Sequence, residues 1–332
     1  MNILSRRFDR IFWIFDANIY YGSKVFTIVF FKRIFASKQL DEKEESGAIS
    51  LEAINRSNLG QIFNNRYRLE QVLSDSSYLA IDIKRERCVV IKHIQFKTNR
   101  SVYLNEITNF IGLETARLVK LTDSCDLIPE LIDYVKAGSN FYLISEYIEG
   151  KTISEELANF QPSELDIAKL IKEILTELQL LHDRNIIHKS IEANQIIRRD
   201  SDFKLMFIYY GNIDEKCYRT MYDECADSIP KKSHVSGVPC STPRTWSSEF
   251  LAGNPQFSSD IYATGLMGIQ LSIGISLRDI PMNPATGKYL WENYCQFSDR
   301  LVSILNRMVE DSLRIRYKTI PEVLDDLDLF IE

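Results

Sequence analysis

The spacing of apolar residues changes near Gly150, and this change constrains the fold more than any other feature of the sequence. After Gly150, apolar residues in 163–185 recur with a helical period, and Ser163 stands where a helix N-cap is expected. Before it, three segments are rich in β-branched and aromatic residues and are typical of strands: 67–72, 78–84 and 88–96. The sequence therefore predicts an α+β fold, with a strand-rich lobe followed by a helical lobe.

Three further segments fill in this two-lobed arrangement. Residues 103–121 have a helical period, and residues 131–150 form two apolar runs around a Gly-Ser-Asn turn, which indicates a hairpin. Residues 186–197, IIHKSIEANQII, predict a strand, a tight loop and a second strand. The core can be large, because 45% of the 332 residues are hydrophobic.

Charge and cysteine usage limit the classes of partner and site. The net charge of -6 gives no reason to expect nucleic acid as a partner. No Cys-x-x-Cys pair is present, so the usual zinc spacing is missing. A cluster of metal-ligand types nevertheless occurs in one segment, where a metal site and free thiols in a reducing cytosol remain as alternatives: Cys217, Cys225, His234 and Cys240.

The N-terminal segment differs in charge from the rest of the chain. Residues 1–40 contain seven Lys and Arg residues against two Asp residues, and apolar residues from Leu4 to Phe15 follow a helical period. The run VFTIVFF is only seven residues long, whereas a spanning helix needs about 20 apolar residues. An amphipathic extension over residues 1–38 can lie on a membrane surface, in a groove of a partner, or on its own domain.

The domain boundaries follow from these changes in composition. Residues 1–40 are expected to be a basic, aromatic anchor, and residues 41–60 a polar linker. The folded domain is expected over 61–332, with its lobes meeting at residues 148 and 149. No secretory signal is evident, so a cytoplasmic location, peripheral to a membrane if the anchor binds lipid, is expected.

Several motifs occur in the order found in one enzyme family. The chain resembles protein kinases over residues 61–331, most closely the cyanobacterial-type serine/threonine kinases. The segments that carry the resemblance are VVIK (89–92), FYLISEYIEG (141–150), TPRTWSSE (242–249), SDIYATG (259–265) and RIRY (314–317).

This resemblance implies roles for individual residues. Lys92 would pair with Glu114 of the following helix, and Ser145 would guard the back of an adenine pocket. The backbone from Glu146 to Ile148 would face the adenine edge. The other implied roles belong to the framework: Arg316 pairs with Glu249, and Asp260 holds the loop at 188–191.

The residues that phosphoryl transfer needs are replaced. No glycine occurs between Gly60 and Gly112, so the expected phosphate cradle at 73–82 is missing. Ser190 replaces the catalytic Asp, and Glu192 stands where such kinases commonly carry a Lys that touches phosphate. Gln195 and Tyr209 replace the two metal ligands, although Mg²⁺ favours carboxylate oxygens.

These departures predict a pseudokinase that serves as a binding, scaffolding or assembly subunit and docks through residues 1–38. The partner expected from this segment is a protein, in a multi-subunit or membrane-bound complex. Neither a metal nor a cofactor is required, although Lys92, Glu114, Glu146 and Ile148 could hold ATP without metal. The alternatives are a metal-independent nucleotide sensor and an atypical active kinase. The oligomeric state is left open.

Overall fold

The computed structural model divides into two compact units, Met1–Ser46 and Gly47–Glu332. No helix in the described part of the chain is both long and apolar enough to cross a membrane. The structure describes residues 14–21, 24–31, 58–95, 101–123, 125–137, 140–208, 211–213, 246–276, 279–283, 286 and 288–332.

The N-terminal unit contains a β-hairpin. Strands β1 (Ile14–Tyr21) and β2 (Lys24–Phe31) are antiparallel, with Ile14 opposite Phe31 and Tyr21 opposite Lys24. The helical period predicted up to Phe15 is therefore wrong where it reaches described residues. β-Branched and aromatic residues dominate both strands, and this composition favours extended structure over a helix. Residues 1–13 and 41–57 lie outside the described residues.

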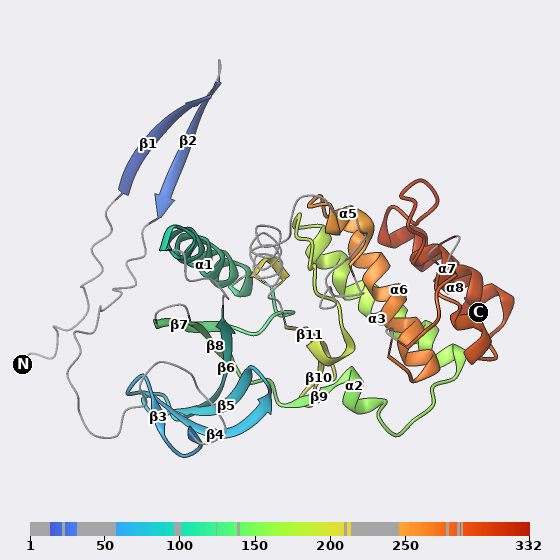
Figure 1. Ribbon diagram of the computed structural model, residues 1–332, viewed down its shortest axis with the longest axis horizontal. Helices are drawn as coiled ribbons and strands as arrows, with labels where there is room; N and C mark the ends of the chain where they lie inside the picture. The colour runs from blue at the N-terminus through green and yellow to red at the C-terminus, as the bar shows by residue number, and fades with distance from the viewer. Residues whose placement is uncertain are drawn as a thin grey trace, which may run out of the picture. The chain divides into compact units, whose positions relative to one another are not determined.

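The second unit begins with an antiparallel sheet of six strands in the order β3-β4-β5-β6-β8-β7 (Figure 1). The strands predicted near 67, 78 and 88 and the hairpin at 131–150 are confirmed. The strands are β3 (Ile62–Phe63), β4 (Tyr67–Ser74), β5 (Ser77–Asp82), β6 (Arg87–Gln95), β7 (Leu131–Ala137) and β8 (Asn140–Glu146).

Alternating burial explains why these segments form a sheet. In β5 every second residue is buried, and Tyr78 and Ala80 contribute to a small core with Tyr67 and Ile91. Helix α1 (Ser101–Thr122) packs against β7 and joins the larger core through residues such as Ile107. The predicted helix at 103–121 is thus confirmed.

The helical lobe is built around two packed helices, α3 (Glu164–His182) and α6 (Phe257–Ile273) (Figure 1). Ser163 is the N-cap of α3, as predicted, and forms a capping box with Asp166. The other helices are α2 (Ile153–Glu156), α5 (Ser248–Leu251), α7 (Asp299–Met308) and α8 (Ile320–Ile331), with 3₁₀ turns η2 (Ala193–Gln195) and η3 (Trp291–Tyr294).

A small sheet of three strands, in the order β11-β10-β9, lies where the lobes meet. Its members are β9 (Gly150–Thr152), β10 (Ile196–Arg199) and β11 (Leu205–Phe207). The predicted second strand at Ile196 is therefore confirmed, whereas the first, at Ile186 and Ile187, is wrong. Burial of Ile186 accounts for its apolar character without strand pairing.

Candidate functional site

A cavity of about 530 Å³ lies between the strand-rich and helical lobes of the second unit. Leu73, Val90 and Lys92 line it from the sheet, and Ile197 and Ile208 line it from the helical lobe. This volume falls within the range of about 300–1,000 Å³ that is usual for small-molecule sites. The cavity is therefore the primary candidate site, and it contains several positions singled out from the sequence.

The ammonium group of Lys92 is bound by the tip of a neighbouring hairpin. Lys92 lies on β6, and its Nζ donates a hydrogen bond to Ser76 Oγ at 2.9 Å. Ser74 pairs with Ser77, so only Asp75 and Ser76 form the turn between β4 and β5. The segment expected to lack a glycine cradle is thus a short turn, and one of its side chains contacts the lysine.

Glu114 does not pair with Lys92, so the ion pair predicted between them is not formed. The carboxylate of Glu114 instead accepts a hydrogen bond from Asn212 Nδ2 at 2.7 Å. Arg117, one helical turn further along α1, lies 3.8 Å from the same carboxylate. These two partners bind the carboxylate of Glu114, while Lys92 contacts the hydroxyl of Ser76.

The segment that joins the lobes forms one wall of the cavity, which is the position expected for a backbone that faces an adenine edge. Ser145, Glu146 and Ile148 all line it, and Ser145 and Ile148 are buried. The N–H of Glu146 donates to the carbonyl of Glu130 at 2.9 Å, which anchors the end of β8. The backbone of Ile148 has no such bond within the described chain.

Two of the four substituted positions bind each other. Ser190 Oγ donates a hydrogen bond to Gln195 Oε1 at 2.8 Å. Gln195 ends η2, and Glu192 precedes it, half-buried and outside the residues that line the cavity. Tyr209, the fourth position, lies outside the described residues. The amide oxygen that could have served a metal therefore already accepts a hydrogen bond from a hydroxyl.

The loop from His188 to Ser190 is held in shape by Asp260 of α6. Its carboxylate accepts from the backbone N–H of His188 at 2.7 Å and of Lys189 at 2.8 Å, and it contacts His182 Nε2 at 2.9 Å. Lys189 adopts a left-handed conformation, with φ of 68°, between these two bonds. The structural role implied for Asp260 is confirmed.

Gly211 packs directly against this loop. A Cβ atom at this position would lie 2.1 Å from the carbonyl oxygen of His188, so only glycine fits. The imidazole of His188 is fully buried, 5.5 Å from the ring of Phe207. Burial lowers the pKa of His188 to about 4, so the ring is neutral near pH 7 and has a structural role.

A buried ion pair holds the region after the long undescribed segment. Arg316 donates to both carboxylate oxygens of Glu249, at 2.7 and 3.2 Å. Burial raises the pKa of Glu249, but hydrogen bonds from Arg316, Ser247 and Ser259 outweigh it and place the pKa below its usual range. The pair implied by the family resemblance is therefore present.

Residues suited to a metal ion are not brought together in the described part of the chain. Magnesium favours carboxylate oxygens, but the described candidate ligand is the amide of Gln195, which Ser190 already occupies. The described one of the two expected ligand positions therefore offers a magnesium ion no carboxylate. The cluster from Cys217 to Cys240 lies outside the described residues.

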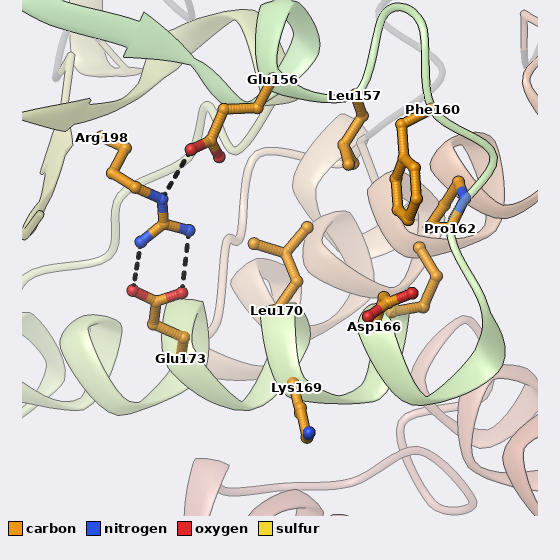
Figure 2. A pocket seen from close by; sticks show the side chains of 10 residues that line it. Glu156, Leu157, Phe160, Pro162, Asp166, Lys169, Leu170, Glu173 and Arg198 are labelled. Carbon is orange, nitrogen blue, oxygen red and sulfur yellow. Dashed lines mark hydrogen bonds and ion pairs between the residues drawn. The ribbon is translucent and has the colours of Figure 1, made fainter.

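A second, smaller hollow of about 270 Å³ lies on the helical lobe, between α2 and α3 (Figure 2). Arg198 of β10 contacts Glu156 at 2.8 Å and Glu173 at 2.6 Å, as the dashed lines in Figure 2 show. Phe160 borders this hollow and is 55% exposed. Sequence reasoning missed this site, since only the fold brings these three charges together.

Comparisons with known proteins agree on one family. The model of the protein kinase domain matches residues 74–324. A serine/threonine-protein kinase PknA from Nostoc sp. is 29% identical over 81% of this chain and 48% of its own length. A serine/threonine-protein kinase C from Synechocystis sp. is 31% identical over 78% of this chain and 49% of its own. The chain thus spans about half the length of these relatives.

Solved structures show the same fold. The kinase domain of Mycobacterium tuberculosis PknI superposes with a TM-score of 0.57, over 81% of this chain and 97% of that domain. Its sequence identity to this chain is 16%, so the likeness concerns the fold alone.

Proposed function

Because the chain belongs to the protein kinase family, we propose that it keeps the kinase framework but acts as a binding, scaffolding or assembly subunit that does not transfer phosphate. One observation carries this proposal: Ser190 and Gln195, at the positions of the base and of a metal ligand, bind each other at 2.8 Å. Their hydrogen bond engages the Ser190 hydroxyl and the Gln195 amide oxygen without substrate or metal.

The chemistry of phosphoryl transfer supports this proposal. The reaction depends on positioning and on neutralising the charge of the phosphates. A serine hydroxyl is a poor proton acceptor at neutral pH, and a glutamine amide carries no charge to neutralise. Lys92, the cation among the cavity-lining residues, contacts a serine hydroxyl and not Glu114. The described residues at the positions of the base, one metal ligand and the phosphate-binding lysine are therefore each less suited to phosphoryl transfer.

The direct test is a transfer assay with labelled ATP, using generic protein substrates and the chain itself. No incorporation above background is expected with either Mg²⁺ or Mn²⁺. Lys92→Ala is the informative variant, and Lys204→Ala, at a lysine that is 57% exposed, is its matched control. Incorporation that persists in the control but vanishes in Lys92→Ala would contradict the proposal.

Docking through residues 1–38 is the second part of the proposal. This segment combines basic and aromatic residues, a composition that suits an apolar protein surface or a membrane-bound complex. Residues 14–31 supply a two-stranded hairpin, and isolated hairpins are marginally stable in water. A partner that covers this hairpin would stabilise it and would place the kinase-like unit at that partner or at a membrane periphery.

Deletion of residues 1–40 tests the docking role. The truncated chain is expected to lose its partner in a pull-down and to leave the membrane fraction. A charge variant with Lys24, Lys32 and Arg33 changed to Gln serves as a matched probe of the basic residues alone. Association that is unchanged by the deletion would remove this part of the proposal.

A metal-independent nucleotide sensor is a second candidate, supported by the cavity and by Lys92 in its wall. ATP in the presence of EDTA would then raise the melting temperature. Absence of any shift in the melting temperature at millimolar ATP counts against a bound nucleotide.

A further inference from the structure

We propose that the cavity between the lobes takes an uncharged planar ring system with hydrogen-bonding groups on one edge, such as a nucleoside, and disfavours its phosphorylated forms. This inference refines the ligand of the second candidate and does not depend on the absence of phosphate transfer. Four features of the described residues support it: the apolar walls of the cavity, the polar groups along one of its edges, its net charge, and the existing partners of the groups that would face phosphates.

The walls of the cavity suit a flat apolar body. Aliphatic side chains contribute from both lobes, with Val90 and Leu131 on the sheet and Ile197 and Ile208 on the helical side. The volume of about 530 Å³ accommodates a bicyclic ring with an attached sugar. Burial of a ring between such walls is favourable by about 25 cal/mol per Å² of apolar surface removed from water.

One edge of the cavity offers polar groups that the fold leaves unused. Ile148 is 5% exposed and lines the cavity. Its N–H donates no hydrogen bond to the part of the chain that the structure describes, and its C=O accepts none from it. Buried backbone groups are nearly always paired. A ligand edge with one acceptor and one donor would satisfy both groups without requiring any charge.

The charge balance of the cavity opposes an anionic ligand. Three lining residues carry charge, namely Lys92, Glu146 and Glu155, which gives one positive and two negative charges, or a net charge of -1. Hydrogen bonds from Thr152 hold the pKa of Glu155 below its usual range, so this carboxylate stays ionised. A triphosphate would add several negative charges to this cavity, and repulsion inside a protein is only partly screened.

The groups that would face phosphates already have partners. Ser76 Oγ lies 2.9 Å from Lys92 Nζ, and the turn that carries Ser76 also carries Asp75, a further negative charge. Gln195, which lines the same cavity, is held by Ser190. A phosphate chain would have to displace these contacts, whereas a ligand without phosphates leaves them in place.

The experiment compares adenosine, AMP and ATP as three probes with one base and increasing charge. The full chain is titrated with each probe in EDTA by calorimetry, and its melting temperature is followed in parallel. Adenosine is expected to bind about tenfold or more tightly than ATP, with AMP between them. Equal or tighter binding of ATP, or no binding of adenosine at millimolar concentration, overturns the proposal.

Two variants connect any binding to this cavity. Lys92→Met is expected to leave adenosine affinity within about twofold, because an uncharged ligand does not need the ammonium group. A tenfold loss in this variant would show that charge attracts the ligand and would overturn the inference. Leu73→Ala, at a wall residue that is 42% exposed, is expected to weaken adenosine binding while the chain stays folded. Unchanged adenosine affinity in Leu73→Ala would place the ligand elsewhere and would also overturn the inference.

These results stay separate from the proposed function. Phosphate transfer by a chain that prefers adenosine would contradict the scaffold role alone. Tighter binding of ATP without transfer would contradict the ligand class alone.

Discussion

Polar residues in the framework of the helical lobe and polar residues in the cleft between the lobes differ in how far along the chain their partners lie. In the framework, Asp260 and Glu249 hold distant parts of the chain through buried contacts of 2.7–3.2 Å. In the cleft, Ser190 and Lys92 bind nearby side chains, namely Gln195 and Ser76. The first set joins segments that are far apart in sequence, and the second set satisfies groups locally.

This difference shows that the contacts that shape the loop at His188 are separate from the side chain that stands at the position of the base. Asp260 and Gly211 still shape the loop at His188, although the base that this loop would present is a serine. The geometry of the loop is therefore retained although Ser190 stands at the position expected for the base. The two sets also make different energetic predictions, because fully buried charges are far more costly to unpair than neutral groups or a half-buried ammonium group beside a cavity.

The largest effect is expected from Glu249→Leu, which leaves the buried guanidinium of Arg316 without its carboxylate. Removal of one partner of a buried ion pair costs about 3–5 kcal/mol of unfolding free energy. Denaturant unfolding followed by circular dichroism measures this loss. The double variant Glu249→Leu with Arg316→Met should regain most of it, because no buried charge is then unpaired.

The exposed ion pair between Arg68 and Glu70 provides the control for this experiment. Arg68→Ala should change the unfolding free energy by no more than about 0.5 kcal/mol, since surface pairs contribute little. A loss below about 1 kcal/mol in Glu249→Leu would mean that the framework is not held by this pair.

The next effect concerns the pH dependence caused by His188. Burial lowers its pKa in the folded state to about 4, whereas the unfolded value is about 6.5. Between these values the unfolded chain binds one more proton, so stability falls as pH decreases from 6.5 to 4. The loss approaches about 3 kcal/mol and is absent above pH 6.5.

His188→Phe removes this titration while keeping an aromatic ring against Phe207. The variant should show a smaller fall in unfolding free energy between pH 6.5 and 4 than the parent chain. His93→Gln is the matched control, because His93 lies on β6, away from the loop, and its replacement should leave the fall in place. An identical pH profile for His188→Phe would contradict neutral burial.

Much of this architecture follows from local patterns. Periodicity and capping act over a few residues, so the sequence alone predicts the strands near residues 67, 78 and 88 and the long helix at 163–185 with its Ser163 cap. The N-terminal helical period failed at β1 because aromatic and β-branched residues satisfy both periods over a short segment. The strand predicted at Ile186 is wrong for a related reason, because an apolar residue can be buried without belonging to a strand.

The sequence predicts only part of the candidate site. Asp260, Glu249 and Arg316 were identified because their motifs stand in family order. The partners of Lys92 and Glu114 are not identified in this way, because the β4–β5 turn brings Ser76 to Lys92 and the helical residues 211–213 bring Asn212 to Glu114. Such contacts depend on side-chain reach in three dimensions, which no spacing rule supplies.

A smaller effect is expected from the hydrogen bond between Ser190 and Gln195. Ser190→Ala and Gln195→Ala each remove one side of a neutral hydrogen bond and should cost about 1 kcal/mol of unfolding free energy. The double variant should cost less than the sum, because both changes remove the same bond. Strict additivity in this cycle would show that the two side chains do not act as a pair.

The smallest effect is expected from the contact between Lys92 and the tip of the β4–β5 hairpin. Ser76→Ala removes the hydroxyl that accepts from Nζ, but the ammonium group is half-buried and can be hydrated. The unfolding free energy should therefore fall by about 0.5 kcal/mol or less. Ser74→Ala, in the same hairpin, is the control for changes in the turn itself. A loss above about 2 kcal/mol in Ser76→Ala alone would mean that Lys92 is held as rigidly as the framework carboxylates, and the contrast between the cleft and the framework would no longer hold.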